Sequence, residues 1–197
     1  MKLHNILDDL LNSRSKVRIL RLMQKHQDRE FTEHEIADMI SMSPNTVNLA
    51  MRELRRTNIF HYRRIGRAHS YRINFDSVLY RLVKNLFENE KKIRESLFGL
   101  LKKDLEGVGT VLVYGSFARE KEDFDSDLDI MIVTKDKNRA EGCFERLSIE
   151  VLRRYSVVLS PVFYTPGELA RNYRKPFLKN ALNEGIYIIG DRIKVPK

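Results

Sequence analysis

The sequence predicts an α/β (α+β) protein of two domains joined by a long helix. Helix-start signals before residue 58 are followed by two strand-like runs, and residues 77–106 carry apolar side chains at helical spacing. Beyond residue 106 the pattern changes to short β-rich runs, TVLVYG, LDIMIVT, YSVVLSPVFYT and GIYIIG, separated by helical stretches. We therefore expect one domain over residues 1–76, a connecting helix over 77–106 and a second domain over 107–197.

The composition is typical of a folded protein without a membrane segment. Of the 197 residues, 42% are hydrophobic and 32% are charged, and no apolar stretch is long enough to span a bilayer. Asp8 and Asp9 interrupt the N-terminal apolar run where a signal peptide would be purely apolar. The single cysteine, Cys143, has no second thiol for an internal disulfide or a zinc site. We expect a cytoplasmic protein with no membrane partner.

The positive charge is local. The net charge is +9, which favours a polyanionic partner or an anionic substrate. Between residues 1 and 76, Lys and Arg number 14 against 9 Asp and Glu, and the whole excess lies after residue 40. The segment that follows residue 40 is therefore the first place to look for a nucleic-acid contact.

Two helix starts can be placed in the first domain. Thr32 and Glu35 have the spacing of a capping box, so a helix should begin at Glu33. Ser43 suits an N-cap and Pro44 suits the first helical position, so a second helix should begin there.

The helix that begins at Pro44 has two distinct faces. An inward stripe is predicted for Val47, Ala50, Met51 and Leu54. A polar stripe is predicted for Asn45, Asn48, Arg52 and Arg55, and Asn and Arg are side chains that reach base edges and phosphates. After this helix two strand-like runs surround a turn at residues 65–68, and they carry Arg63, Arg64, Arg67 and Arg72. The alternative interpretation of the charged helix face is a merely solvated surface.

This order of helices followed by a basic hairpin resembles the winged helix-turn-helix family of transcription regulators, over residues 14–75. The resemblance implies that the helix after Ser43 enters the major groove of double-stranded DNA and that the hairpin lies against the phosphates or the minor groove. It also favours a homodimer, since such proteins often bind DNA in pairs. Winged helices also serve as protein-interaction modules, which remains open.

The stretch YGSFAREKEDFDSDLDIMIV, residues 114–133, combines a glycine turn with paired acids. TVLVYG reads as a buried strand ending at Gly115, and Ser116 is expected to cap a short helix whose N–H groups could hold phosphate oxygens. Asp127 and Asp129 are two residues apart at the start of the next strand, so they should face the same side, with Leu128 in the core. Two carboxylates in one place favour a bound cation such as Mg²⁺.

Gly115-Ser116, ten intervening residues and Asp127-Leu128-Asp129 resemble the motif of the DNA polymerase β nucleotidyltransferase superfamily, in particular its minimal branch, over about residues 90–191. The resemblance implies a mixed sheet with flanking helices. It also implies nucleotide contacts from Gly115 and Ser116 and a catalytic Asp127 and Asp129 that bind Mg²⁺ or Mn²⁺. The ligand would be a nucleoside triphosphate such as ATP, with Arg119 as a further phosphate contact. The alternatives are a loop of solvated acids for the aspartates and a plain surface role for Arg119.

The sequence departs from this family at one position. Active members usually carry a third carboxylate on a later strand, where it is assigned the general-base role and part of one metal site. The corresponding strand here, YSVVLSPVFYT, has no Asp or Glu; Ser160 stands near the expected place, and Pro161 suggests an edge strand or a bulge. Glu168, on the next helix, is a poor substitute by position. Whether the domain is an active enzyme therefore remains open.

Three functions follow from these patterns. The first is a DNA-binding nucleotidyltransferase that transfers a nucleoside monophosphate to a protein or small-molecule acceptor. In the minimal branch such enzymes are antitoxin-like, which would make a cognate toxin the acceptor and the winged helix autoregulatory. The second is a transcription regulator whose silent nucleotidyltransferase domain senses nucleotide. The third is a structural adaptor with neither activity.

Overall fold

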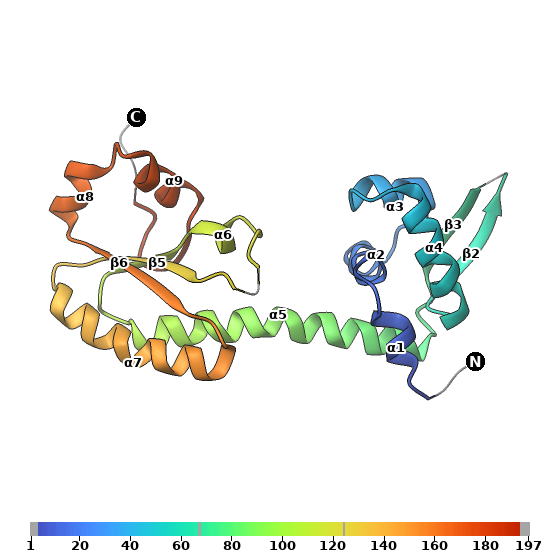
Figure 1. The fold of residues 1–197 in the computed structure, drawn as a ribbon, viewed down its shortest axis with the longest axis horizontal. Helices are drawn as coiled ribbons and strands as arrows, with labels where there is room; N and C mark the ends of the chain where they lie inside the picture. The colour runs from blue at the N-terminus through green and yellow to red at the C-terminus, as the bar shows by residue number, and fades with distance from the viewer. Residues whose placement is uncertain (1–3, 67, 124, 194–197) are drawn as a thin grey trace. The chain divides into compact units, whose positions relative to one another are not determined.

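The computed structural model describes residues 4–66, 68–123 and 125–193 (Figure 1). The chain divides into two compact units, residues 1–92 and 93–197, and each has its own hydrophobic core. The division falls inside one helix, α5 (Val78–Asp104), so this helix contributes to both cores.

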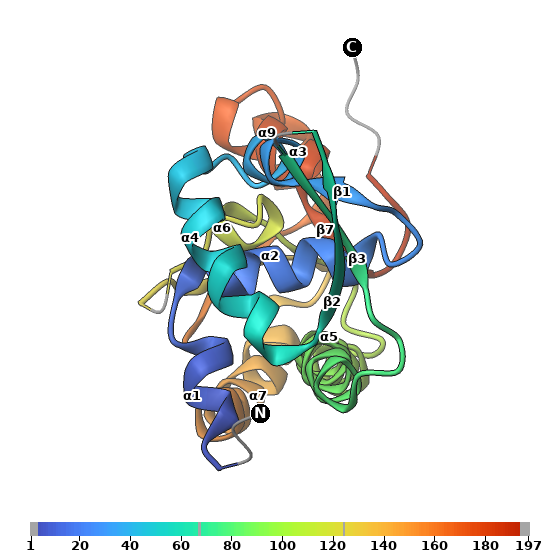
Figure 2. The ribbon, with the colours of Figure 1, turned by 90° about the vertical axis from the view of Figure 1, so that its right-hand side faces the viewer.

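The first unit packs helices against a small antiparallel sheet (Figure 2). Its helices are α1 (Ile6–Leu11), α2 (Arg14–Lys25), α3 (Glu33–Met39), α4 (Pro44–Leu54) and a 3₁₀ turn (Arg55–Thr57). Its strands are β1 (Phe31–Thr32), β2 (Phe60–Ile65) and β3 (Ala68–Ile73), in the order β1-β3-β2. The helices α2, α3 and α4, followed by the hairpin of β2 and β3, form a winged helix-turn-helix, as the sequence predicts.

Local signals explain where α3 and α4 begin. The Thr32 hydroxyl accepts the Glu35 N–H, and the Glu35 carboxylate accepts the Thr32 N–H at 2.8 Å, which completes the predicted capping box. The Ser43 hydroxyl accepts the Thr46 N–H at 3.2 Å, with proline at the first helical position. The inward stripe of α4 is confirmed, since Val47, Ala50, Met51 and Leu54 are all buried.

A buried lysine ties α4 to the two first helices. Lys16 on α2 is only 3% exposed; its ammonium donates to the backbone oxygen of Asp9 at 2.6 Å and is ion-paired with Glu53 on α4. A buried ammonium is stable only when it is paired and hydrogen-bonded, so these contacts fix the seating of α4. Glu53, the one acid beside the polar stripe, is thereby occupied within the fold.

The apolar residues of α5 are not all buried as a single stripe. Tyr80 and Val83 belong to the core of the first unit, whereas Leu97 and Leu101 belong to that of the second. Other residues of the predicted stripe are exposed, namely Val78, Leu82, Leu86 and Ile93. Each half of the helix therefore buries some apolar side chains in the core of its own unit and leaves others exposed.

The second unit is a mixed four-stranded sheet with helices on both faces (Figure 1). In chain order its elements are β4 (Thr110–Val113), α6 (Gly115–Ala118), β5 (Leu128–Val133), α7 (Lys137–Tyr155), β6 (Leu159–Tyr164), α8 (Pro166–Asn172), α9 (Pro176–Glu184) and β7 (Ile186–Ile189). The strand order is β6-β5-β4-β7; β5 and β6 are parallel and the other pairs antiparallel.

Alternation along the strands divides the core into two layers. One face carries Val111, Val113, Leu128, Ile130 and Ile132 against α5 and α7. The other carries Leu112, Tyr114, Met131 and Val133 against α8 and α9. Because Asp129 alternates with Leu128 and Ile130, it lies on the α9 side of the sheet.

β6 lies at the edge of the sheet, as its proline predicts. The Leu128 N–H donates to the Val158 oxygen at 2.8 Å and the Thr134 N–H donates to the Tyr164 oxygen at 2.9 Å. The even-numbered residues of β6 therefore bond to β5, and the backbone of Pro161 faces outward. The missing N–H of this proline costs the sheet no hydrogen bond.

Within the described residues we find no helix long and apolar enough to cross a membrane.

Candidate functional site

The glycine turn after β4 brings the backbone against a carboxylate. Gly115 has φ +78°, a conformation that side-chain-bearing residues rarely adopt. A Cβ added there would collide with the Oδ2 atom of Asp129. Both the backbone angle and the close approach therefore require glycine at this position.

Asp127 and Asp129 flank the start of β5 as predicted. Leu128 between them is 2% exposed and packs in the opposite layer. Burial raises the pKa of Asp129, the negative charge of Asp127 raises that pKa further, and the Arg119 guanidinium partly opposes the rise. Asp129 is half-buried and lines the cavity described below, whereas Asp127 is exposed and acts on Asp129 through its charge.

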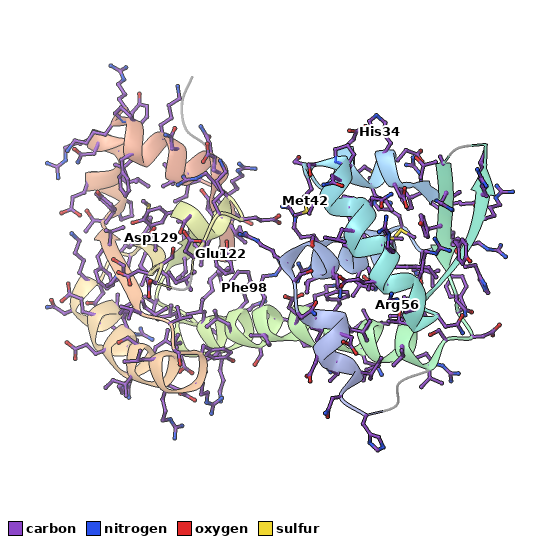
Figure 3. All side chains as sticks on the ribbon, turned by 45° about the vertical axis from the view of Figure 1, so that its right-hand side comes forward. His34, Met42, Arg56, Phe98, Glu122 and Asp129 are labelled. Carbon is purple, nitrogen blue, oxygen red and sulfur yellow. The ribbon has the colours of Figure 1, made fainter. Side chains whose placement is uncertain are left out.

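A cavity of about 290 Å³ opens at this point. Its walls come from the glycine turn, β5 and α9: Tyr114, Gly115, Arg119, Asp129, Phe177, Asn180, Ala181 and Glu184. The rings of Tyr114 and Phe177 meet edge to face with their centroids 5.4 Å apart. Figure 3 labels Asp129 among the side chains of this unit. The cavity combines an aromatic wall, an amide, a cation and a carboxylate.

Burial raises the pKa of Tyr114 to about 12, with the nearby charge of Asp129 acting in the same direction. The Tyr114 hydroxyl therefore stays protonated at neutral pH. It can donate a hydrogen bond into the cavity but does not act as a base there.

On β6, the strand beside β5, the hydroxyl of Ser160 lies near the place where the family resemblance implies a third carboxylate. Ser160 pairs with Asp129 in the parallel register, so both side chains lie on the same face of the sheet. Within residues 4–66, 68–123 and 125–193, no three His, Cys, Asp or Glu side chains come together as a metal-binding group.

Glu168 and Glu184 are the nearby acids on the last helices, and both have partners. Glu168 completes a capping box with Thr165 and is ion-paired with Lys137 at 2.7 Å, which lowers its pKa to about 2. Glu184 lines the cavity and lies 3.7 Å from Arg119. Sequence reasoning missed Glu184, Asn180 and Phe177, because nothing in their local pattern brings α9 to the glycine turn.

The expectation that Ser116 caps the helix after β4 is wrong. The helix α6 already includes Gly115, its N-cap is Tyr114, and no side chain caps it. The positive φ of Gly115 turns the chain one residue earlier than a serine cap would. The backbone oxygen of Ser116 accepts the N–H groups of Arg119 and Lys121, so Ser116 closes the loop, and only Gly115 of the pair lines the cavity.

The predicted DNA-contacting side chains of α4 are joined to α3. Asn45 is exposed, whereas the Asn48 amide donates to Glu33 of α3 at 3.0 Å. Arg52 donates to the Asn48 side-chain oxygen at 3.4 Å. Glu33 also accepts the hydroxyl hydrogen of Tyr71 at 2.7 Å, and burial together with this contact raises the pKa of that tyrosine. Glu33 therefore orients Asn48, a role the sequence did not reveal.

Three further basic residues of the prediction, Arg55, Arg63 and Arg64, also have partners. Arg55 lies in the 3₁₀ turn beyond α4, with its guanidinium 3.7 Å from the centre of the Tyr62 ring on β2. Arg63 makes two hydrogen bonds, at 2.8 and 2.6 Å, to the Glu30 carboxylate. Arg64 donates to the Gly66 oxygen, and Arg67 lies outside the described residues.

Sequence reasoning also passed over Arg56, in the same 3₁₀ turn and labelled in Figure 3. Its side chain is exposed and forms no ion pair with the described part of the chain.

Comparison with known proteins identifies the second unit. Residues 95–192 match the family model described as "Polymerase beta, Nucleotidyltransferase". No curated protein matched the chain.

Several solved structures resemble the first half of the chain. One is NolR from Sinorhizobium fredii, at 18% identity over 45% of this chain and 79% of that one, with a TM-score of 0.36. Another is the efflux-pump transcription regulator MepR of Staphylococcus aureus, at 17% identity over 46% and 69%, with a TM-score of 0.37. A third is a homodimeric winged helix-turn-helix DNA-binding domain from Mycobacterium bovis, a possible ArsR-family regulator, at 23% identity over 44% and 85%, with a TM-score of 0.35.

Residues 95–192 are therefore a nucleotidyltransferase domain of the polymerase beta family, which this chain joins to a preceding winged helix-turn-helix.

Proposed function

We propose that the second unit transfers a nucleoside monophosphate from a nucleoside triphosphate, such as ATP, to a protein or small-molecule acceptor. One observation carries this proposal: Gly115, Arg119 and Asp129 line a single cavity, with the charge of Asp127 acting on Asp129. A backbone turn, a cation and an acid pair are the groups needed to position a polyphosphate and a divalent ion.

The donor set fits one hard cation. Asp127 and Asp129 supply carboxylate oxygens, and their mutual repulsion would be relieved by Mg²⁺ or Mn²⁺. When bound, the ion would hold phosphate oxygens and neutralise the charge that develops on the leaving pyrophosphate. A second ion would need a third carboxylate as a ligand, and none lies with these two acids among the described side chains. The residues therefore support a single metal site.

The other cavity residues would bind and orient the nucleotide. The backbone at Gly115 lets a phosphate approach closely, and Arg119 supplies a guanidinium for phosphate oxygens. Phe177 and Asn180 on α9 offer a ring and an amide to the base. An acceptor oxygen then attacks the α-phosphorus, the bond to the bridging oxygen breaks, pyrophosphate leaves, and the acceptor proton passes to water.

Incubation with ATP labelled at its α-phosphate, Mg²⁺ and cell lysate tests this activity. We expect labelling of an acceptor by the native chain and none by the double variant Asp127→Ala with Asp129→Ala. Asp125→Ala, an exposed acid in the same loop, is the matched control and should label normally. Labelling that survives the double variant refutes the assignment.

A second candidate function is a nucleotide-sensing regulator without turnover. The serine opposite Asp129 favours it, because Ser160 cannot serve as the third carboxylate. Calorimetry would then show ATP binding without pyrophosphate release, and the DNA affinity would change when ATP is added. The variant Ser160→Asp sharpens the test. If pyrophosphate is released by this variant and not by the native chain, the native domain binds nucleotide without catalysing its transfer.

For the first unit, we propose binding to double-stranded DNA through α4 and the hairpin, with autoregulation of an operon by an antitoxin-like protein whose acceptor is a cognate toxin. The exposed Asn45 and Arg52 on α4 and the basic hairpin support it. Gel-shift titration against the chain's own promoter region tests the DNA step. Binding no tighter than to an unrelated duplex of equal length contradicts it.

We also propose that the protein pairs as a homodimer, because α5 exposes Val78 and Ile93, which are 73% and 60% exposed. Sedimentation analysis tests this step, and Ile93→Glu should shift a dimer to monomer. A native chain that sediments as a monomer at tens of micromolar contradicts it.

A further inference from the structure

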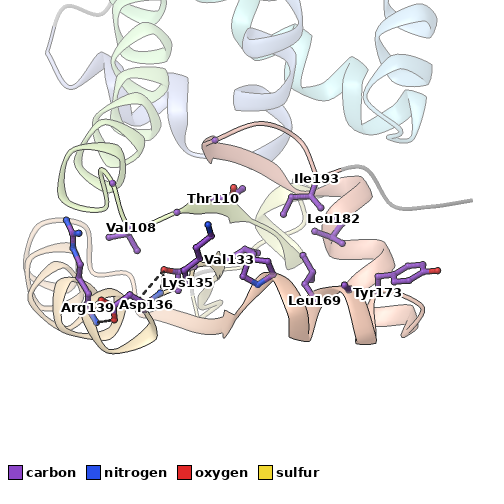
Figure 4. A pocket seen from close by; sticks show the side chains of 16 residues that line it. Val108, Thr110, Val133, Lys135, Asp136, Arg139, Leu169, Tyr173, Leu182 and Ile193 are labelled. Atoms are coloured by element: carbon purple, nitrogen blue, oxygen red, sulfur yellow. Dashed lines mark hydrogen bonds between the residues drawn. The ribbon is translucent and has the colours of Figure 1, made fainter.

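The second unit has another cavity, which is larger than the one beside Asp129. It has a volume of about 810 Å³ and lies where β4 begins and β5 ends (Figure 4). The two cavities share no lining residue. A volume of this size is typical of small-molecule sites.

The walls of this cavity are mainly apolar. Val108, Val133, Leu169, Leu182 and Ile193 line it, and Tyr173 stands at the end away from Arg139 in Figure 4. Val133, Leu169 and Leu182 also belong to the buried layer beneath α8 and α9, so the floor of the cavity is part of the core. An apolar body would be desolvated there at little cost.

The charges at the rim select an anion. Lys135 and Arg139 line the cavity, and neither side chain forms an ion pair with any described residue. The one lining acid, Asp136, already caps α7 by accepting the Arg139 N–H at 3.0 Å. The next acid, Glu168, is held by Lys137. The two basic side chains, Lys135 and Arg139, outnumber the one lining carboxylate, Asp136, so the rim of the cavity carries a net positive charge.

We propose that this cavity binds a small organic acid with an apolar body, whose carboxylate meets Lys135 and Arg139 while the body lies on Val133, Leu169 and Leu182. Charge complementarity at the rim and the apolar floor together define this class of ligand. The site is independent of the nucleotide cavity, and its binding does not require the acids Asp127 and Asp129.

Decanoate and its neutral counterpart decan-1-ol are suitable probes, because they share the apolar body and differ in charge. Isothermal calorimetry on the full chain should show decanoate binding at least tenfold more tightly than the alcohol. The double variant Lys135→Gln with Arg139→Gln should remove this preference and leave the alcohol unaffected. Arg146→Gln, an exposed arginine of the same helix outside the cavity, should keep it.

A cavity-filling variant locates the site. Ala170 is exposed on α8 and lines the cavity, so Ala170→Trp should abolish binding of both probes while thermal unfolding confirms a native fold. Binding by the Asp127→Ala, Asp129→Ala variant should equal the native value, which separates this proposal from the proposed function.

Two results would overturn the proposal. The first is no decanoate binding to the native chain. The second is equal binding of acid and alcohol that the charge variants do not change.

Discussion

The polar surface of the first unit and the cavity of the second differ in how their charges are balanced. In the first unit three candidate DNA-contacting groups already have partners: Glu33 holds Asn48, Glu30 holds Arg63, and Arg55 lies on Tyr62. In the second, burial and the charge of Asp127 raise the pKa of Asp129, and Arg119 partly opposes the rise. Side chains that are already paired are held in a fixed orientation, but they must break those contacts before they can bind DNA. Two like charges near each other, by contrast, are stabilised when a ligand of opposite charge binds between them.

The largest effect is expected where the backbone itself makes the nucleotide cavity. Gly115→Ala forces an alanine into a positive φ and against Asp129, so we expect unfolding by urea to become easier by about 1–3 kcal/mol, with ATP binding lost. Gly142→Ala is the matched control: this helical glycine has open space around it, and alanine there should stabilise by about 0.5–1 kcal/mol. Equal responses of the two variants would contradict the close approach described at Gly115.

The second effect concerns Arg52, the exposed basic residue of α4. Arg52 has one long hydrogen bond, so it is available to a base edge, and Arg52→Ala should weaken operator binding by about 1–3 kcal/mol. Fluorescence anisotropy with cognate and scrambled duplexes measures the loss, which should be greater for the cognate one. Arg146→Ala, in the second unit, should leave both affinities unchanged.

A smaller effect should follow from releasing a paired arginine of the hairpin. Glu30→Gln removes the carboxylate that holds Arg63, so the DNA affinity should rise and its logarithmic salt dependence should steepen by about 0.9 for one added phosphate contact. Glu90→Gln is the control, since Glu90 on α5 also accepts two hydrogen bonds from an arginine, both from Nη2 of Arg21, outside the hairpin. A slope unchanged in Glu30→Gln would mean that Arg63 does not reach DNA.

The smallest effect is a pH dependence. Because the pKa of Asp129 is raised in the folded state, its contribution to stability is fully present below its unfolded value of 3.8 and is lost as the pH rises through the raised pKa. Asp127→Asn removes the neighbouring charge, so the pKa of Asp129 should fall and this loss should shrink. NMR titration of the Asp129 carboxyl carbon in both proteins measures the difference, and an unchanged pKa would contradict the repulsion.

The sequence predicted features that depend on neighbouring residues and missed those that join distant ones. The capping box at Thr32, the serine cap at Ser43 and the alternation around Leu128 all follow from spacings of a few residues. The pairing of Glu33 with Asn48 spans 15 residues and that of Glu30 with Arg63 spans 33.

The nucleotide cavity shows the same division. Gly115 and Asp129 were predicted from their motif, whereas the cavity wall from α9 depends on how that helix packs on the sheet. Ser116 was misplaced because a serine after a strand suggests a cap, whereas the glycine before it set the turn. Tertiary packing, which a single sequence does not display, decided the wall from α9, whereas the local backbone turn at Gly115 decided the position of Ser116.

The proline of β6 has a consequence for the molecule in a crowded cell. An open sheet margin is a template on which a foreign strand can dock and begin an aggregate, and Pro161 removes a donor from the middle of that margin. The proline therefore makes this edge a poorer template for a foreign strand, and it lies next to Ser160, the serine that pairs with Asp129.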